Sequence, residues 1–211
     1  FTGTSGMLVI TQTEAFLITD FRYLTQAKME APQFILVDHT GEKLLPATGE
    51  WIKKSSFKSL AFEATHLTFQ EYQELQQIIH PIELLPTSHV VEALRIQKDE
   101  QELAWIRQAV AIADQAFSLI LEELTPGMTE RYVAFRMEAL MRELGAEAIA
   151  FDTIVASGKR SALPHGRASD KKLEKGDLVT LDFGVYYKGY ASDLTRTIVL
   201  GQAAAWQKEI Y

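Results

Sequence analysis

The most constraining feature of this 211-residue sequence is a run of apolar residues spaced three and four apart over positions 103–124. Such spacing is typical of one face of a helix, and Asp99 followed by Glu102 predicts a capping box at its start. The predicted buried face consists of Leu103, Ile106, Val110, Ala113, Phe117, Ile120 and Leu124. Because a helix of this kind is stable only when its apolar face is covered, a packed domain is expected around it.

A second amphipathic helix follows the first. Pro126-Gly127 is expected to end the first helix, Thr129 to cap the second and Gly145 to terminate it. The predicted buried side of the second helix carries Val133, Met137, Leu140, Met141 and Leu144. From there the sequence is rich in β-formers, with strands predicted over 153–156, 178–183, 185–190 and 194–200.

The first part of the chain alternates short strands with helices. Strands are predicted over 7–10 and 15–18, joined as a hairpin, and over 34–37, with a helix over 69–79. Such interleaving is typical of a small α/β domain. Pro81 and Pro86 punctuate its end. The predicted organisation is a first domain over 1–87, a linker over 88–98 and a second domain over 99–211.

Composition excludes several classes of partner. Lys and Arg number 21 against 28 Asp and Glu, a net charge of −7 without a basic cluster, so no nucleic-acid partner is expected. No apolar run reaches the ~18 residues of a membrane span, so no membrane partner is expected either. The chain has no cysteine. It can form neither a disulfide nor a thiolate metal site, which suits a cytoplasmic location.

The segment 178–198 is predicted to form a hairpin that carries two aspartates. With the turn centred between Tyr187 and Lys188, Asp182 would lie directly opposite Asp193, on one face of the sheet. Two such carboxylates would repel each other unless a divalent cation bridged them. Oxygen ligands suit Mn²⁺ or Mg²⁺, with zinc or cobalt as alternatives. The competing interpretation is a pair of solvated aspartates, and a slip of one residue would place them on opposite faces.

His165 is the second candidate for a functional side chain. It lies between Pro164 and Gly166, in a turn of restricted conformation. An imidazole held there can bind a substrate or transfer a proton near neutral pH. The alternative is an ordinary histidine in a surface loop.

The remaining candidates are interpreted as structural. His39, His66, His80 and His89 have no partners at ligand spacing in the sequence and are expected to be structural or exposed. The segment 3–6 is interpreted as a turn, because a strand and not a helix follows it. Asp20 and Arg22 are expected to make local contacts at a strand surface.

Four stretches of the sequence together resemble one protein family. They are 1–6 with Leu17-Ile-Thr-Asp-Phe-Arg-Tyr23, Pro126-Gly-Met-Thr-Glu130, Phe151-Asp-Thr-Ile-Val-Ala-Ser-Gly158 through Pro164-His-Gly166, and Asp182-Phe-Gly184 with Ser192-Asp-Leu-Thr-Arg-Thr197. In order and spacing they resemble the pita-bread metallopeptidases, in the branch of Xaa-Pro dipeptidase (prolidase) and aminopeptidase P. The resemblance covers nearly the whole chain.

The resemblance implies a fold, a site and a reaction. It implies an α/β amino-terminal domain of creatinase type and an α+β pita-bread catalytic domain. Asp182 and Asp193 match metal ligands, His165 matches the histidine that contacts substrate and stabilises the reaction intermediate, and Thr195 matches a residue that supports the metal site. The implied cofactors are two divalent ions, with manganese expected and cobalt or zinc as alternatives. A bridging hydroxide would attack the Xaa-Pro bond of a dipeptide or short peptide, in a homodimer.

The sequence departs from the family pattern after Asp193. The family site also needs a histidine and two glutamates downstream, where this chain offers only Glu209. The first domain is expected to lack its opening strand and helix. We therefore expect a fragment that is inactive alone, from an intact protein that is a peptidase. The alternatives are a creatinase-like hydrolase that is not a peptidase and a non-catalytic binding module of the same fold.

Overall fold

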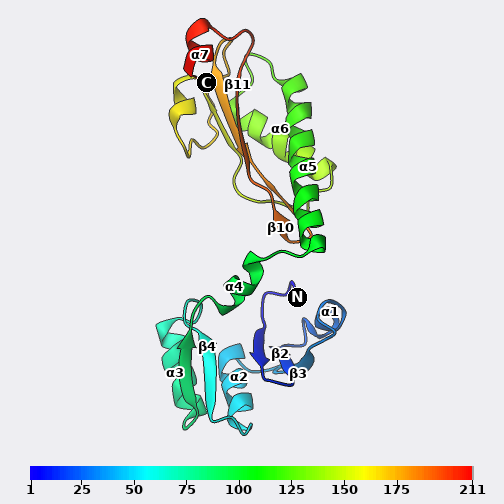
Figure 1. The fold of residues 1–211 in the computed structure, drawn as a ribbon, viewed down its shortest axis with the longest axis vertical. Coiled ribbons are helices and arrows are strands. Elements are labelled where there is room, and N and C mark those ends of the chain that lie inside the picture. Colours follow the sequence, from blue (N-terminus) through cyan, green and yellow to red (C-terminus); the bar gives the residue numbers. More distant parts are fainter. Residues whose placement is uncertain (211) are drawn as a thin grey trace. The chain divides into compact units, whose positions relative to one another are not determined.

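The computed structural model describes residues 1–210, and the chain divides into two compact units between Ile96 and Gln97 (Figure 1). The segment 88–98, predicted as a linker, contains helix α4 (Val90–Ile96), which belongs to the first unit. Among residues 1–210, no helix has the length and apolar character needed to cross a membrane.

The first unit interleaves strands and helices as predicted. Its elements before α4 are β1 (Met7–Ile10), β2 (Ala15–Thr19), α1 (Leu24–Glu30), β3 (Ile35–Asp38), α2 (Leu44–Lys53), β4 (Ser59–Glu63), α3 (Phe69–Ile79) and β5 (Glu83–Thr87). Strands β1 and β2 form the expected antiparallel hairpin, and β3 pairs parallel to β2. Strands β4 and β5 form a separate parallel pair. The α/β architecture expected for this region is therefore confirmed.

The second unit begins with two helices and continues with strands. Its elements are α5 (Glu100–Glu123), α6 (Glu130–Glu143), β6 (Ala148–Ile149), β7 (Ile154–Ser157), the 3₁₀ helix η1 (Gly158–Ala162), β8 (Leu178–Phe183), β9 (Val185–Tyr187), β10 (Tyr190–Ala191), β11 (Leu194–Val199) and α7 (Ala205–Ile210). Asp99 and Glu102 form the predicted capping box of α5, and Thr129 caps α6 by accepting from the N–H of Tyr132. Both predicted helix starts are confirmed.

The buried face of α5 is rotated from the predicted one. Its fully buried residues are Ala109, Ile112, Ala113, Ala116 and Ile120, whereas Val110 and Phe117 are only half-buried. Three of these five are alanines, whose small side chains allow a neighbouring element to pack closely against the helix. Helix α6 packs there with Val133, Met137, Leu140 and Met141, as predicted.

Strand β8 lies at the centre of a three-stranded sheet, between β11 and β7. Its Val179, Leu181 and Phe183 are fully buried in the core with the two helices, and the Phe183 ring stacks on Phe117 with centroids 5.9 Å apart. The alternate residues, Thr180 and Asp182, are half-buried on the opposite face. The sheet therefore has one apolar face covered by helices and one polar face, as the period of a half-buried strand requires.

The predicted register of the aspartate hairpin is wrong. Tyr187 pairs with Tyr190 across a two-residue turn in which Lys188 and Gly189 have φ angles of 51° and 77°. Positive φ at both central residues is the signature of a type I′ turn, whose twist matches that of the two strands. The turn is therefore centred one residue later than predicted, and Asp182 pairs with Thr195 and not with Asp193.

Candidate active site

Asp182 is held on the polar face of the sheet from both sides. Its strand neighbours are Thr195 of β11 and Ile154 of β7. The hydroxyl of Thr195 donates to Oδ1 of Asp182 at 2.8 Å. No hydrogen bond within residues 1–210 reaches the other carboxylate oxygen, Oδ2. Asp182 is thus an oriented carboxylate whose second oxygen can coordinate a cation.

Asp193 lies at an interruption of the strand pairing. Ser192 donates its N–H to the carbonyl of Val185, but Val185 donates in return to the Ser192 hydroxyl and not to its carbonyl. Continuing the register places Asp193 opposite Gly184, where an added Cβ would lie 2.1 Å from the Ser192 carbonyl oxygen. Only glycine permits this close approach. Asp193 is exposed and lies two residues before Thr195. Within residues 1–210, no side chain forms a hydrogen bond or ion pair with its carboxylate.

The loop that carries His165 lies against the same polar face. Thr180, two residues before Asp182, donates its hydroxyl to the carbonyl of Ser161 in η1 at 3.4 Å. His165 follows in a turn that is closed by the Gly166 N–H donating to the Leu163 carbonyl at 3.2 Å. The imidazole is exposed. The loop therefore lies beside this sheet face, and within residues 1–210 no hydrogen bond or ion pair joins His165 to either aspartate.

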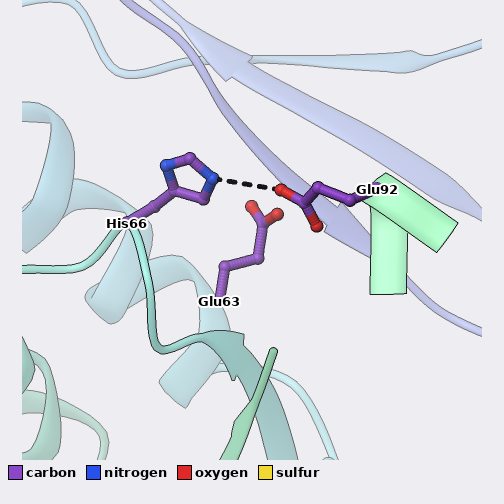
Figure 2. A group of neighbouring side chains, drawn as sticks. All are labelled: Glu63, His66 and Glu92. Carbon is purple, nitrogen blue, oxygen red and sulfur yellow. Dashed lines mark hydrogen bonds and ion pairs between the residues drawn. The ribbon is translucent and has the colours of Figure 1, made fainter. Parts of the chain in front are cut away.

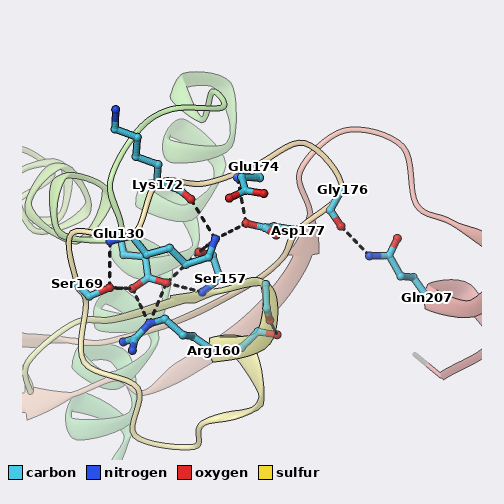
Figure 3. Close-up of polar contacts among 12 residues, drawn as sticks. Glu130, Ser157, Arg160, Ser169, Lys172, Glu174, Gly176, Asp177 and Gln207 are labelled. Carbon is cyan, nitrogen blue, oxygen red and sulfur yellow. Dashed lines mark hydrogen bonds and ion pairs between the residues drawn. The ribbon is translucent and has the colours of Figure 1, made fainter.

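Glu130, the first residue of α6, was not predicted as a site residue. Its side chain is 0% exposed, yet it accepts hydrogen bonds from Ser157, Arg160 and Ser169 (Figure 3). Burial raises the pKa of this carboxyl, but the hydrogen bonds from the two serines outweigh burial and hold the pKa below its usual value. The partners lie 27 to 39 residues further along the chain, so no local sequence pattern predicts these hydrogen bonds.

The donor set on the polar face suits a hard divalent cation. Asp182 and Asp193 offer carboxylate oxygens, and within residues 1–210 no Lys, Arg or His forms an ion pair with either. Carboxylate oxygens are the ligands that Mn²⁺ and Mg²⁺ prefer, whereas this cysteine-free chain has no thiolate for a softer ion. The two residues therefore fit a role as part of a metal-ligand set.

A second group of possible ligands lies in the first unit. The ligand atoms of Glu63, His66 and Glu92 lie within 4.8 Å of one another, and Nε2 of His66 is 3.5 Å from Oε1 of Glu92 (Figure 2). His66 is exposed as expected, but the expectation that it has no ligand-spaced partner is wrong. Glu63 ends β4 three residues before His66, whereas Glu92 comes from α4 and is brought to them by the fold. Exposed acidic groups commonly cluster without an ion, and His66 and Glu92 already form a hydrogen bond with each other at the surface.

Asp20 and Arg22 make the local contact expected of them. Nε and Nη2 of Arg22 donate to the two oxygens of Asp20 at 2.8 and 2.7 Å. This bidentate hydrogen bonding from Arg22 lowers the pKa of Asp20 to about 2. The pair stabilises the chain where β2 ends and α1 begins, and it belongs to the structure of the first unit.

Comparison with known proteins gives two family matches. Residues 104–211 match Metallopeptidase family M24, and residues 1–97 match the Creatinase/Prolidase N-terminal domain. An uncharacterized peptidase of Bacillus subtilis is 46% identical over 211 residues, which are 100% of this chain and 60% of that protein. These matches confirm the resemblance inferred from the sequence motifs.

Solved structures agree with the family matches. An Xaa-Pro dipeptidase from Bacillus anthracis has a TM-score of 0.93 and 45% identity, covering 100% of this chain and 59% of that structure. An X-Pro aminopeptidase from Thermotoga maritima has a TM-score of 0.92 and 36% identity over the same shares. The chain therefore spans about 60% of the length of the relatives it matches.

Proposed function

This chain belongs to metallopeptidase family M24, and on that basis we propose that the whole protein is a metal-dependent exopeptidase acting on Xaa-Pro bonds. The Bacillus anthracis protein is named an Xaa-Pro dipeptidase and the Thermotoga maritima protein an X-Pro aminopeptidase, and both names specify this bond. The proposed substrates are therefore dipeptides or short peptides with proline in the second position.

One observation supports the proposal most directly. Asp182 is oriented by Thr195 on a polar sheet face against which the His165 loop packs. Asp182 and Asp193 are proposed to contribute ligands to two divalent ions, with manganese as the proposed metal. The chemistry that such ions supply is Lewis-acid activation of water and of a carbonyl group.

The chain's own residues have three proposed roles. The carboxylates of Asp182 and Asp193 supply negative charge and oxygen ligands. The imidazole of His165 donates a hydrogen bond to the carbonyl oxygen of the scissile bond, where negative charge develops during attack. Thr195 keeps the Asp182 carboxylate in one orientation through the 2.8 Å hydrogen bond.

A cytoplasmic location and a homodimer complete the proposal. The cysteine-free composition supports a reducing compartment. Sedimentation analysis of the whole protein measures the oligomeric state, and a monomer at all concentrations would remove the homodimer from the proposal.

The test is cleavage of Ala-Pro compared with Ala-Leu by the whole protein, stripped of metal and reloaded with Mn²⁺. We expect cleavage of Ala-Pro alone, its loss in Asp182→Asn, and its retention in Asp114→Asn, which removes a carboxylate of α5. Equal cleavage of the two dipeptides would refute proline specificity. Cleavage of neither would favour a binding module. Adding Ala-Pro-Ala separates a dipeptidase from an aminopeptidase.

A further inference from the structure

Glu130 is a buried carboxylate with an unusually complete set of hydrogen bonds. Oε1 accepts from the N–H of Ser157 at 2.7 Å and from its hydroxyl at 2.9 Å. Oε2 accepts from the N–H and hydroxyl of Ser169 at 3.1 and 2.6 Å. Nε of Arg160 lies 3.0 Å from Oε2 and 3.3 Å from Oε1. Both oxygens are thus shared among partners from three places in the chain.

The negative charge of the buried Glu130 carboxylate is compensated by these partners. A fully buried carboxylate is costly unless it is paired and hydrogen-bonded, and losing one partner leaves the charge uncompensated. Arg160 supplies the opposite charge, and the start of α6 supplies the positive end of a helix dipole. The helix alone needs no such side chain, because Thr129 already caps it. The buried charge is therefore directed at the loop and not at the helix.

The partners of Glu130 bracket the loop that carries His165. Ser157 ends β7, directly before the loop, and Ser169 follows the loop after Ala168. Arg160 lies inside the loop and also donates from Nη2 to the Arg167 carbonyl at 2.6 Å, which links the two sides of the loop. One side chain therefore fixes the entry, the interior and the exit of residues 158–168 (Figure 3).

A lysine reinforces the entry of the loop. Nζ of Lys171 donates to the Ser157 hydroxyl at 3.0 Å and to Oδ2 of Asp177 at 2.7 Å. The Ser157 hydroxyl thereby joins two ion pairs, Glu130–Arg160 and Lys171–Asp177. Networks of this kind are rigid because each bond orients its neighbour.

We propose that Glu130 is the positioning residue of the His165 loop, so that His165 reaches substrate only while the Glu130 anchor is intact. The proposal rests on the proposed function of His165. Whether Glu130 holds the loop in place can be measured without an assay of enzymatic activity.

Hydrogen exchange of the whole protein tests the anchor directly. Glu130→Gln replaces one carboxylate oxygen, which accepts hydrogen bonds, with an NH2 group, which donates them, so one serine loses its acceptor. We expect the exchange rates of the backbone amides in 158–168 to rise about tenfold or more. The matched control is Glu123→Gln, which removes a carboxylate held by Arg136 at 2.8 Å between α5 and α6. Ser169→Ala removes a single hydroxyl and serves if Glu130→Gln does not fold. Unchanged exchange in the folded variants would overturn the proposal.

A double-mutant cycle in the whole protein tests the action through His165. We expect Glu130→Gln to lower kcat/KM for Ala-Pro about tenfold or more, and to add little in a His165→Ala background. A full additional loss in that background would mean that Glu130 acts elsewhere, and would overturn the proposal. If the protein cleaves no Xaa-Pro substrate, the proposed function fails, whereas the exchange measurement still decides whether Glu130 anchors the loop.

Discussion

Thr195 donates a hydrogen bond of 2.8 Å to Asp182 across the pair of strands β8 and β11, at the position where two aspartates were expected to face each other. A hydroxyl in this place removes the repulsion that a second carboxylate would cause. It also orients one oxygen of Asp182 and leaves the other open. The candidate metal ligand is therefore positioned before any ion binds.

The first prediction concerns this hydroxyl. Thr195→Val keeps the shape of the side chain and removes the donor, so we expect Mn²⁺ affinity to fall about 10- to 100-fold, as for other residues that orient a metal ligand. Thr195→Ser retains the donor and is expected to bind nearly as tightly. Calorimetric titration of the whole protein measures both, in a His66→Gln background that removes the second ligand group. Equal affinities for the valine and serine variants would contradict the role of Thr195.

The second prediction concerns the close approach at Gly184. A Cβ there would meet the Ser192 carbonyl oxygen at 2.1 Å, and backbone cannot move aside as a flexible side chain can. We expect Gly184→Ala to lower the free energy of unfolding by about 2 kcal/mol, within the range of roughly 1–3 kcal/mol that is typical of overpacking, as measured by urea unfolding. Gly189→Asn is the control, because nothing lies within 4 Å of its Cβ position and asparagine tolerates positive φ. Equal stability of the two variants would refute the clash.

Local signals account for what could be predicted from the sequence. A capping box joins residues three apart in the sequence, so Asp99 and Glu102 predicted the start of α5. Thr129 predicted the start of α6 in the same way, as a residue type that caps helices. The strand predicted over 178–183 is β8, whose alternation places Asp182 and Phe183 on opposite faces.

Two features of the site depend on non-local or conformational information. The hairpin register depends on which two residues adopt positive φ, and a lysine at position 188 gives no sign that it does so. Glu130 looked like an ordinary first-turn glutamate, since its partners Ser157 and Ser169 are brought to it only by tertiary folding. Motif resemblance located Asp182 and Asp193 in the chain, but it could not supply their geometry.

The third prediction concerns Asp20 and acid stability. Its pKa is about 2 in the folded chain, against an ordinary 3.8, because Arg22 donates two side-chain hydrogen bonds to the carboxylate. Near pH 3 the folded state therefore binds fewer protons than the unfolded state, so this stabilisation is complete above pH 3.8 and is lost as the pH falls toward 2. We expect Asp20→Asn to flatten the pH dependence of urea unfolding in that window.

A direct titration checks the cause of the Asp20 shift. In ¹³C NMR of the side-chain carboxyl, Arg22→Gln is expected to return the pKa of Asp20 toward its ordinary value. A pKa that stays near 2 in this variant would show that the guanidinium is not responsible.

The fourth prediction tests the hairpin register through its turn. Lys188 has a φ angle of 51°, in a region that costs most residues roughly 1–2 kcal/mol, whereas Asn-Gly is the preferred pair of a type I′ turn. Lys188→Asn is therefore expected to stabilise the chain by about 0.5–1 kcal/mol, since the ion pair it removes, Lys188 with Glu147 at 3.6 Å, is exposed. Lys188→Val is the opposite control, because a β-branched residue is strained at positive φ, and it should destabilise the hairpin.

Had the turn been centred between Tyr187 and Lys188, position 188 would still lie in the turn but Gly189 would lie outside it, and Gly189→Val would be tolerated. Urea unfolding of the three variants therefore separates the two registers: strong destabilisation by Gly189→Val supports Asp182 opposite Thr195, and a neutral result restores the aspartate pair.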